Sequence, residues 1–198
     1  AYGLTEASPG VCCNPLDLTK FSGSVGLPVP STLVRICDEA GHPVGDSKAG
    51  ELYVKGPQVM PGYWRRPEET RAVLSADGWL RTGDIATMDA KGYVRIIDRK
   101  KDLIIVSGFN VYPNEVEDVL IAHPGIAEAG VIGKPHETSG EIVVAFVVKS
   151  IASVSEAEIE HYCRQSLASY KVPREIRFVQ ELPKSNIGKV LRRKLRAP

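Results

Sequence analysis

The stretch TGDIATMDAKGYVRIIDRKKDLIIVSGFNVYPNEVEDVL occupies residues 82–120. It joins a strand-like apolar run to a helix-like run through five consecutive charged residues, Asp98 to Asp102. Ionic residues of this kind suit a connection that is exposed to water, because no unpaired charge is then buried. The pattern is β-rich before this stretch and mixes helices with strands after it, so we expect the charged stretch at the border of two domains.

The residues before this border are expected to form short strands separated by turns. Residues 33–37 are an apolar run that ends in a turn sequence, and residues 50–56 alternate between two glycines. Residues 85–88 and 93–97 flank a four-residue turn, which predicts a β-hairpin. Pro67 opens a short helix. The pattern indicates a small β-rich unit.

The residues after the border mix helices with strands. Pro113 begins a segment with apolar residues at helical spacing, and Ser155 with Glu158 predicts a capping box. A short basic helix is expected over residues 188–196. Strands are predicted at residues 127–132, 142–148 and 176–179. The fold class is therefore α+β: residues 1–98 form a β-rich subdomain, 99–101 a hinge, and 102–198 a small domain with a short sheet and flanking helices.

The composition is that of an ordinary globular protein. Of its 198 residues, 43% are hydrophobic and 25% are charged. The net charge of +1 creates no overall field that would require a nucleic acid partner. No apolar run approaches the roughly 18 residues of a membrane span. The first residues lack both a signal peptide and an initiator Met, which indicates a processed chain or part of a longer one.

The cysteines and histidines have no spacing typical of a metal site or a redox motif. The sequence contains Cys12, Cys13, Cys37 and Cys163, with histidines at positions 42, 123, 136 and 161. Adjacent cysteines rarely close a relaxed disulfide. We expect buried or incidental thiols and a reducing, cytoplasmic setting.

Two short motifs could hold a nucleotide. In one, Thr5 and Glu6 place a hydroxyl beside a carboxylate, a pair that can hold a phosphate oxygen and Mg²⁺; the alternative is a plain turn. In the other, Asp84 follows a glycine and can accept two hydrogen bonds from a ribose diol, while Arg99 could reach the same ribose or a phosphate. The alternative is an ordinary turn aspartate and a surface arginine.

A third motif surrounds Lys189. Small polar residues over 183–189 predict a flexible loop that can present an ammonium group to a phosphoryl group and that leads into a helix N-terminus. The loop lacks the spacing of a Walker P-loop. A solvated basic turn is the alternative. The basic helix that follows is either a solvated face or a surface for coenzyme A (CoA) phosphates or anionic lipid.

Seven motifs occur in one order along the chain. They are YGLTE (2–6), GYW (62–64), DGWLRTGD (77–84), DRKKD (98–102), SGFNVYPNEVE (107–117), YKVP (170–173) and PKSNIGK (183–189). This series resembles the adenylate-forming superfamily of acyl-CoA synthetases, luciferases and peptide-synthetase adenylation domains. The resemblance covers the whole chain and is greatest to bacterial long-chain fatty acid–CoA ligases. Trp64 and Trp79 lie in these motifs and are expected to be packing residues.

The resemblance implies a two-step reaction in a longer enzyme, of which this chain is the C-terminal part and alone inactive. A carboxylate attacks the α-phosphate of ATP to give acyl-AMP, and CoA then takes the acyl group. By resemblance, Lys189 supplies a positive charge for adenylation and Thr5 contacts the AMP phosphate. Glu6 binds Mg²⁺, while Asp84 and Arg99 hold the ribose. Tyr2 packs near the adenine and the acyl site.

The resemblance also implies a rotation of the small domain between the two steps. Lys101 aligns with the family's hinge residue. After rotation, Ser107, Gly108 and Phe109 would face the active site, and Gly108 would leave room for the pantetheine arm. The expected partners are fatty acid, ATP and CoA, with no nucleic acid; peripheral contact with the inner face of the membrane and the oligomeric state stay open. Two alternatives remain: a ligase for an aryl or short acid, and a nucleotide- or CoA-binding module without catalysis.

Overall fold

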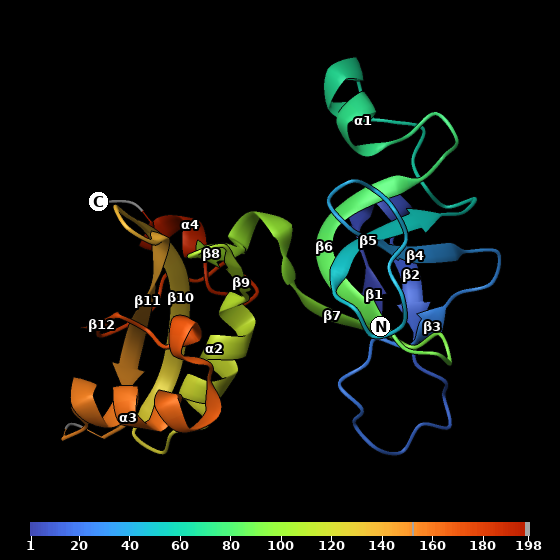
Figure 1. Cartoon of the computed structure of the whole chain (residues 1–198). Coiled ribbons are helices and arrows are strands. Elements are labelled where there is room, and N and C mark those ends of the chain that lie inside the picture. Colours follow the sequence, from blue (N-terminus) through green and yellow to red (C-terminus); the bar gives the residue numbers. More distant parts are fainter. Residues whose placement is uncertain (152, 197–198) are drawn as a thin grey trace. The chain divides into compact units, whose positions relative to one another are not determined.

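The computed structural model describes residues 1–151 and 153–196 (Figure 1). The chain divides into two compact units, the first ending at Lys100 and the second beginning at Lys101. Each unit has its own hydrophobic core.

The first unit contains two antiparallel sheets. One sheet has the order β1-β2-β3 and the other the order β4-β5-β6-β7. Their strands are β1 (Tyr2–Gly3), β2 (Gly10–Cys13), β3 (Leu27–Pro28), β4 (Leu33–Cys37), β5 (Gly50–Lys55), β6 (Leu80–Met88) and β7 (Val94–Arg99). A 3₁₀ helix, η1 (Thr5–Ala7), follows β1, and one α-helix, α1 (Pro67–Val73), begins with the predicted proline. The β6–β7 pairing confirms the predicted hairpin.

A backbone junction links the two sheets of the first unit. Val94 donates its amide hydrogen to Gly26 O at 2.9 Å and accepts from Val25 N at 2.8 Å. Gly26 has φ +99°, and a Cβ at this position would lie 2.1 Å from the Cys13 carbonyl group. Only glycine fits here, because a side chain would collide with backbone atoms that cannot give way. The fully buried Leu52 packs in the same core.

The second unit is built on one five-stranded sheet. Its strands are β8 (Ile104–Val106), β9 (Phe109–Val111), β10 (Ile126–His136), β11 (Gly140–Lys149) and β12 (Glu175–Phe178). β11 is the central strand, antiparallel to β10 and β8 and parallel to β12. The helices are α2 (Pro113–Ile121), α3 (Glu156–Ser166) and α4 (Arg192–Leu195), with one 3₁₀ helix, η3 (Ser169–Lys171). A further 3₁₀ helix, η2 (Lys100–Asp102), begins at the last residue of the first unit. The predicted capping box of Ser155 and Glu158 is confirmed at the start of α3.

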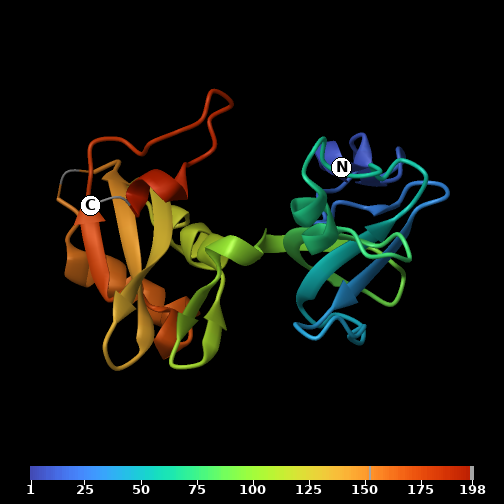
Figure 2. The ribbon, with the colours of Figure 1, turned by 90° about the horizontal axis from the view of Figure 1, so that it is seen from above.

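The two faces of this sheet are covered by different parts of the chain (Figures 1 and 2). On one face, α2 and α3 pack over Val143, Ala145 and Val147 of β11. On the other face, Val144 and Phe146 lie in a smaller apolar cluster with Leu182, Val190 and Leu195. Successive side chains of a strand point to opposite faces. Burial on both faces therefore explains why the predicted strand 142–148 is almost wholly apolar.

Three sequence-based expectations are wrong. The predicted helix over 188–196 is reduced to the four residues of α4, because the residues before it form a hairpin. Asp98 is only 2% exposed, so the charged stretch is not solvent-exposed throughout. Trp64 is 84% exposed and does not pack in the core, whereas Trp79 lies under the Arg35 guanidinium at 4.1 Å. Within the described ranges, no helix combines the length and apolar character that crossing a membrane requires.

Candidate functional site

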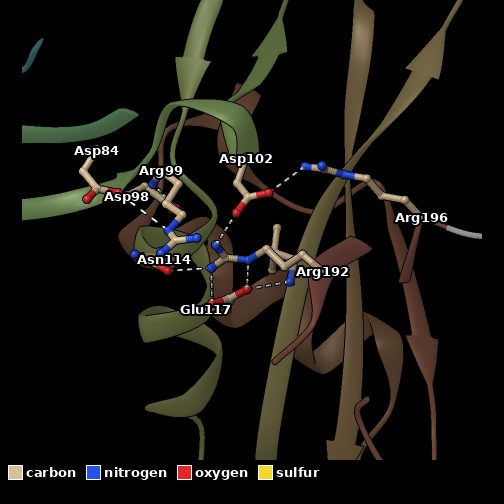
Figure 3. Close-up of polar contacts among 9 residues, drawn as sticks. Asp84, Asp98, Arg99, Asp102, Asn114, Glu117, Arg192 and Arg196 are labelled. Carbon is tan, nitrogen blue, oxygen red and sulfur yellow. Dashed lines mark hydrogen bonds and ion pairs between the residues drawn. The ribbon is translucent and has the colours of Figure 1, made fainter. Parts of the chain in front are cut away.

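The carboxylate of Asp84 is the centre of a polar group in the first unit. Tyr2 Oη donates to Asp84 Oδ2 at 2.6 Å, and Arg99 Nε lies 3.6 Å from Asp84 Oδ1. Asp84 and Arg99 are opposite each other in the β6–β7 ladder, and Figure 3 shows the arginine pointing toward the carboxylate. Burial and the hydrogen bond to Asp84 both raise the pKa of Tyr2, so the phenol stays a donor. The structure thus brings together three residues that the sequence predicted as nucleotide ligands.

Asp84 lies within strand β6 rather than in the expected turn, and its neighbours in β6 and β5 hold it in place. Thr82 Oγ1 donates to Leu52 O at 2.8 Å and accepts from Asp84 N at 3.1 Å. Gly83 has φ +73°, a backbone conformation that favours glycine. Its amide hydrogen is donated to Glu51 Oε1 at 3.2 Å. The Asp84 side chain, 14% exposed, is therefore held by its own backbone as well as by Tyr2.

Glu51, which the sequence analysis did not identify, supports this part of β6 from the neighbouring strand β5. Its side chain is 5% exposed, and its Oε2 accepts from Lys100 Nζ at 2.9 Å and from Arg81 Nη2 at 3.1 Å. Burial acts to raise the pKa of Glu51, but the hydrogen bonds from the two cations outweigh it and hold the pKa below its ordinary value. Strand periodicity alone gave no sign that this carboxylate is buried, because the burial comes from its partners in β6 and η2.

Thr5 and Glu6 lie in η1, directly after β1. Glu6 Oε1 accepts a 2.8 Å hydrogen bond from the hydroxyl of Tyr63, which raises the Tyr63 pKa. Tyr63 comes from the GYW motif that the sequence analysis noted. Within residues 1–151 and 153–196 the second oxygen of Glu6 has no hydrogen-bond partner, and no three His, Cys, Asp or Glu side chains gather as a metal site. A single free carboxylate oxygen suits Mg²⁺, which takes one or two carboxylates together with substrate phosphates.

Lys189 lies in a hairpin rather than at a helix N-terminus. Ser185 N donates to Lys189 O at 2.8 Å, and Gly188 N donates to Ser185 O at 2.9 Å. Lys184 and Val190 pair as an antiparallel bridge at its base. The expectation that a helix begins directly after the loop is wrong, because α4 begins only at Arg192. The exposed Lys189 side chain has no ion-pair partner in the part of the chain that the structure describes.

Ser107 and Gly108 form the two-residue turn between β8 and β9. Both have positive φ, 51° and 83°, as expected for a tight hairpin turn. A Cβ at Gly108 would meet no atom within 4 Å, so the backbone conformation, not crowding, accounts for glycine in this structure. Phe109 is 56% exposed and stacks on Tyr170, with ring centroids 4.7 Å apart. Tyr170 belongs to the YKVP motif and was not predicted as a site residue.

Lys101 is the exposed middle residue of η2. Its neighbours are fixed within their own units. Lys100 is paired with Glu51, and Asp102 is paired with Arg192 and Arg196 at 3.5 and 3.3 Å. Lys101 itself has no side-chain partner among the described residues.

Comparison with known proteins gives matches in both units. Residues 1–64 match the family described as AMP-binding enzyme, and residues 115–189 match the AMP-binding enzyme C-terminal domain. A long-chain-fatty-acid–CoA ligase of Yersinia pestis is 60% identical over 98% of this chain. The chain spans 34% of the length of that relative, about a third.

Two solved structures share the fold. ATP-bound MatB from Rhodopseudomonas palustris is 42% identical, with a TM-score of 0.93 over 98% of this chain and 39% of that chain. The o-succinylbenzoate CoA synthetase of Bacillus subtilis, in complex with its acyl-adenylate intermediate, is 37% identical, with a TM-score of 0.89 over 100% of this chain and 40% of that chain. Sequence and structure comparisons agree, and the chain belongs to the AMP-binding family of adenylate-forming enzymes.

Proposed function

We propose that this chain is part of an ATP-dependent fatty acid–CoA ligase that forms acyl-AMP and then acyl-CoA. The observation that carries the proposal is the convergence of Tyr2 and Arg99 on the carboxylate of Asp84, at 2.6 and 3.6 Å. A carboxylate held in this way can accept two hydrogen bonds from a ribose diol. The 60% identity to a long-chain-fatty-acid–CoA ligase supports fatty acids as the substrate class.

The first step joins the acid to the nucleotide. The acid's carboxylate oxygen attacks the α-phosphorus of ATP, the bond to the β-phosphate oxygen breaks, and pyrophosphate leaves. Asp84 and Arg99 hold the ribose, and the Thr5 hydroxyl contacts the α-phosphate. Lys189 brings a positive charge to the phosphoryl group, where negative charge increases in the transition state. Its exposure and its position in a closed hairpin support this role.

Glu6 would hold Mg²⁺ through the oxygen that Tyr63 leaves free. When bound, Mg²⁺ neutralises charge on the phosphates. Tyr63 orients the carboxylate by its hydrogen bond, and Tyr2 keeps Asp84 in place beside the nucleotide.

The four free cysteines support a reducing, cytoplasmic location.

The second step transfers the acyl group to the CoA thiol and releases AMP. We infer that the second unit turns about Lys101 between the steps, so that the turn at Ser107 and Gly108 replaces the Lys189 hairpin. The open space around Gly108 and the exposed ring of Phe109 support passage of a slender pantetheine arm.

The test uses the longer protein that contains this chain. Asp84→Asn removes one charge from the ribose site, and Asp46→Asn is the matched control, since Asp46 is exposed in the same unit without a side-chain partner there. We expect Asp84→Asn to weaken AMP binding about 10- to 100-fold, the usual effect of losing hydrogen bonds to a charged group. Calorimetric titration gives the affinity, and equal affinity for both variants would contradict the ribose role.

ATP–pyrophosphate exchange with a panel of acids tests the substrate class. Exchange that is greatest with long-chain fatty acids supports the proposal. Exchange with aromatic acids instead would favour the alternative suggested by the o-succinylbenzoate CoA synthetase, 37% identical. AMP binding without exchange for any acid would indicate a non-catalytic nucleotide-binding module.

A further inference from the structure

Arg192 is enclosed by residues from two other parts of the second unit (Figure 3). Its Nη2 donates to Glu117 Oε2 at 2.6 Å and to Asn114 Oδ1 at 2.5 Å, and its Nε donates to Glu117 Oε1 at 3.0 Å. Its Nη1 lies 3.5 Å from Asp102 Oδ2. The guanidinium therefore joins α2 to the residue that directly follows Lys101.

This group is largely removed from water. The side chains of Arg192 and Asp102 are each 13% exposed, and that of Glu117 is 14% exposed. Glu117 Oε1 also accepts the amide hydrogen of Val131 on β10 at 2.8 Å, so the carboxylate cannot turn freely. A guanidinium that is hydrogen-bonded through Nε and Nη2 and ion-paired at Nη1 has a defined position and orientation. The single ammonium group of a lysine could not reproduce this arrangement.

The apolar contacts around Arg192 do not define a position by themselves. Val190 and Leu195 pack on the sheet near Gly130, where an added Cβ would lie 2.9 Å from Leu195 Cδ1. Such contacts are non-directional. The contacts of Arg192 are directional, and so is the ion pair of Lys184 with Glu128 at 2.5 Å at the base of the same hairpin. They fix the segment along the sheet as well as against it.

The catalytic lysine of the proposed reaction lies close to Arg192 in the chain. Three peptide units separate Lys189 from Arg192, a span of at most about 10 Å. Leu191 N donates to Pro183 O at 2.7 Å on one side of Lys189, and Gly188 N donates to Ser185 O at 2.9 Å on the other, so the hairpin is closed on both sides of Lys189. Whatever fixes Arg192 therefore also fixes the place from which Lys189 extends.

We propose that Arg192 is a positioning residue for adenylation, holding the Lys189 hairpin at a fixed place relative to Asp102. This inference rests on the proposed function. Asp102 directly follows the hinge residue, so a turn of the backbone at Lys101 carries Asp102, Arg192 and the hairpin as one body. Arg196, 3.3 Å from the other oxygen of Asp102, is a second tie to the same carboxylate. Without Arg192 the hinge could still turn, but the segment that carries Lys189 would lose its tie to α2 and one of its two ties to Asp102.

The test compares Arg192→Gln with Arg193→Gln in the longer protein. Arg193 is adjacent and exposed, and among the described residues its side chain has no partner, so it is a matched control. Acyl-adenylate formation is measured by pyrophosphate exchange, and thioester formation is measured separately from supplied acyl-adenylate. We expect Arg192→Gln to slow adenylation about 10- to 100-fold, because a misplacement of about 1 Å has effects of that size. Thioester formation should change by less than about 3-fold.

A second variant and a second measurement keep the proposal open to contradiction. Arg192→Lys keeps the positive charge but loses the paired hydrogen bonds of the guanidinium. The variant should therefore fold and show the same selective loss of adenylation rate. Hydrogen exchange at the amides of Ser185 and Leu191 should become faster in both variants and stay unchanged in Arg193→Gln. Equal losses in both half-reactions would mean that Arg192 only stabilises the fold. An unchanged adenylation rate, or unchanged hydrogen exchange at the hairpin amides, would overturn the proposal. A wild-type protein without pyrophosphate exchange would refute the proposed function. Hydrogen exchange at the amides of Ser185 and Leu191 would still test whether Arg192 holds the hairpin in place.

Discussion

The hydroxyl of Tyr2 and the carboxylate of Asp84 lie 2.6 Å apart although 82 positions separate them in the sequence. β1 supplies one partner and β6 the other, and the two strands belong to different sheets. This bond connects the first motif of the chain with the third. It makes the position of Asp84 depend on the folding of the whole first unit.

Tyr2→Phe should therefore destabilise the first unit. The variant loses a hydrogen bond to a charged group, which typically contributes about 1.5–3 kcal/mol. Tyr93→Phe is the control, because the Tyr93 hydroxyl has no hydrogen-bond partner among the residues described. Thermal unfolding compares the two. A midpoint for Tyr2→Phe equal to that for Tyr93→Phe would mean that the bond contributes nothing.

Lys189→Ala in the longer protein should impair adenylation selectively. Loss of one preorganised charged donor typically lowers a rate about 10²–10³-fold. Lys194→Ala removes an equally charged, exposed residue nearby and should leave the rate unchanged. Pyrophosphate exchange measures the first step, and thioester formation from supplied acyl-adenylate measures the second. Equal losses in both steps would show that Lys189 does not act in adenylation alone.

Lys101→Pro tests the hinge. Proline fixes φ near −65° and disfavours helical geometry at the preceding residue, here Lys100. Lys101 lies in the 3₁₀ helix η2, so the substitution opposes the local backbone geometry and should lower stability. In an irregular connection the same substitution would cost less. We expect the two half-reactions to separate, with adenylation largely kept and CoA transfer strongly reduced.

Lys101→Ala is the control for the lost charge, and thermal unfolding shows whether the proline variant is folded. A folded Lys101→Pro protein with normal rates in both steps would place the pivot elsewhere.

The buried Glu51 predicts a specific acid sensitivity. Its pKa in the folded chain lies below the ordinary value of 4.5, so between these values the unfolded chain binds more protons. The stabilisation is complete above about pH 4.5 and is lost as the pH falls through the folded-state pKa. The thermal unfolding midpoint should thus decrease less between about pH 7 and about pH 4 in Glu51→Gln than in the wild type. Glu39→Gln, at an exposed position, should behave as the wild type does.

The sequence by itself determined the local structure and the family. Period-two and helical spacing, Pro67 and Pro113 at helix starts and the capping box of Ser155 and Glu158 are signals within a few residues, and the structure has each of these elements. Seven ordered motifs were enough to indicate the adenylate-forming family, because each motif is contiguous. They also named Asp84, Arg99 and Tyr2, which do converge.

Only the tertiary structure decided which charges are buried and what they hold. Asp98, Glu51 and Arg192 look like ordinary surface residues in the sequence, yet all three are largely buried. For Glu51 and Arg192 the burial comes with partners tens of residues away, Lys100 and Glu117. The basic run after Gly188 has helical composition, yet the backbone hydrogen bonds of residues 183–191 close a hairpin first. Helix propensity did not decide the structure there, because this segment also packs on the second face of the sheet and places Arg192 against Glu117.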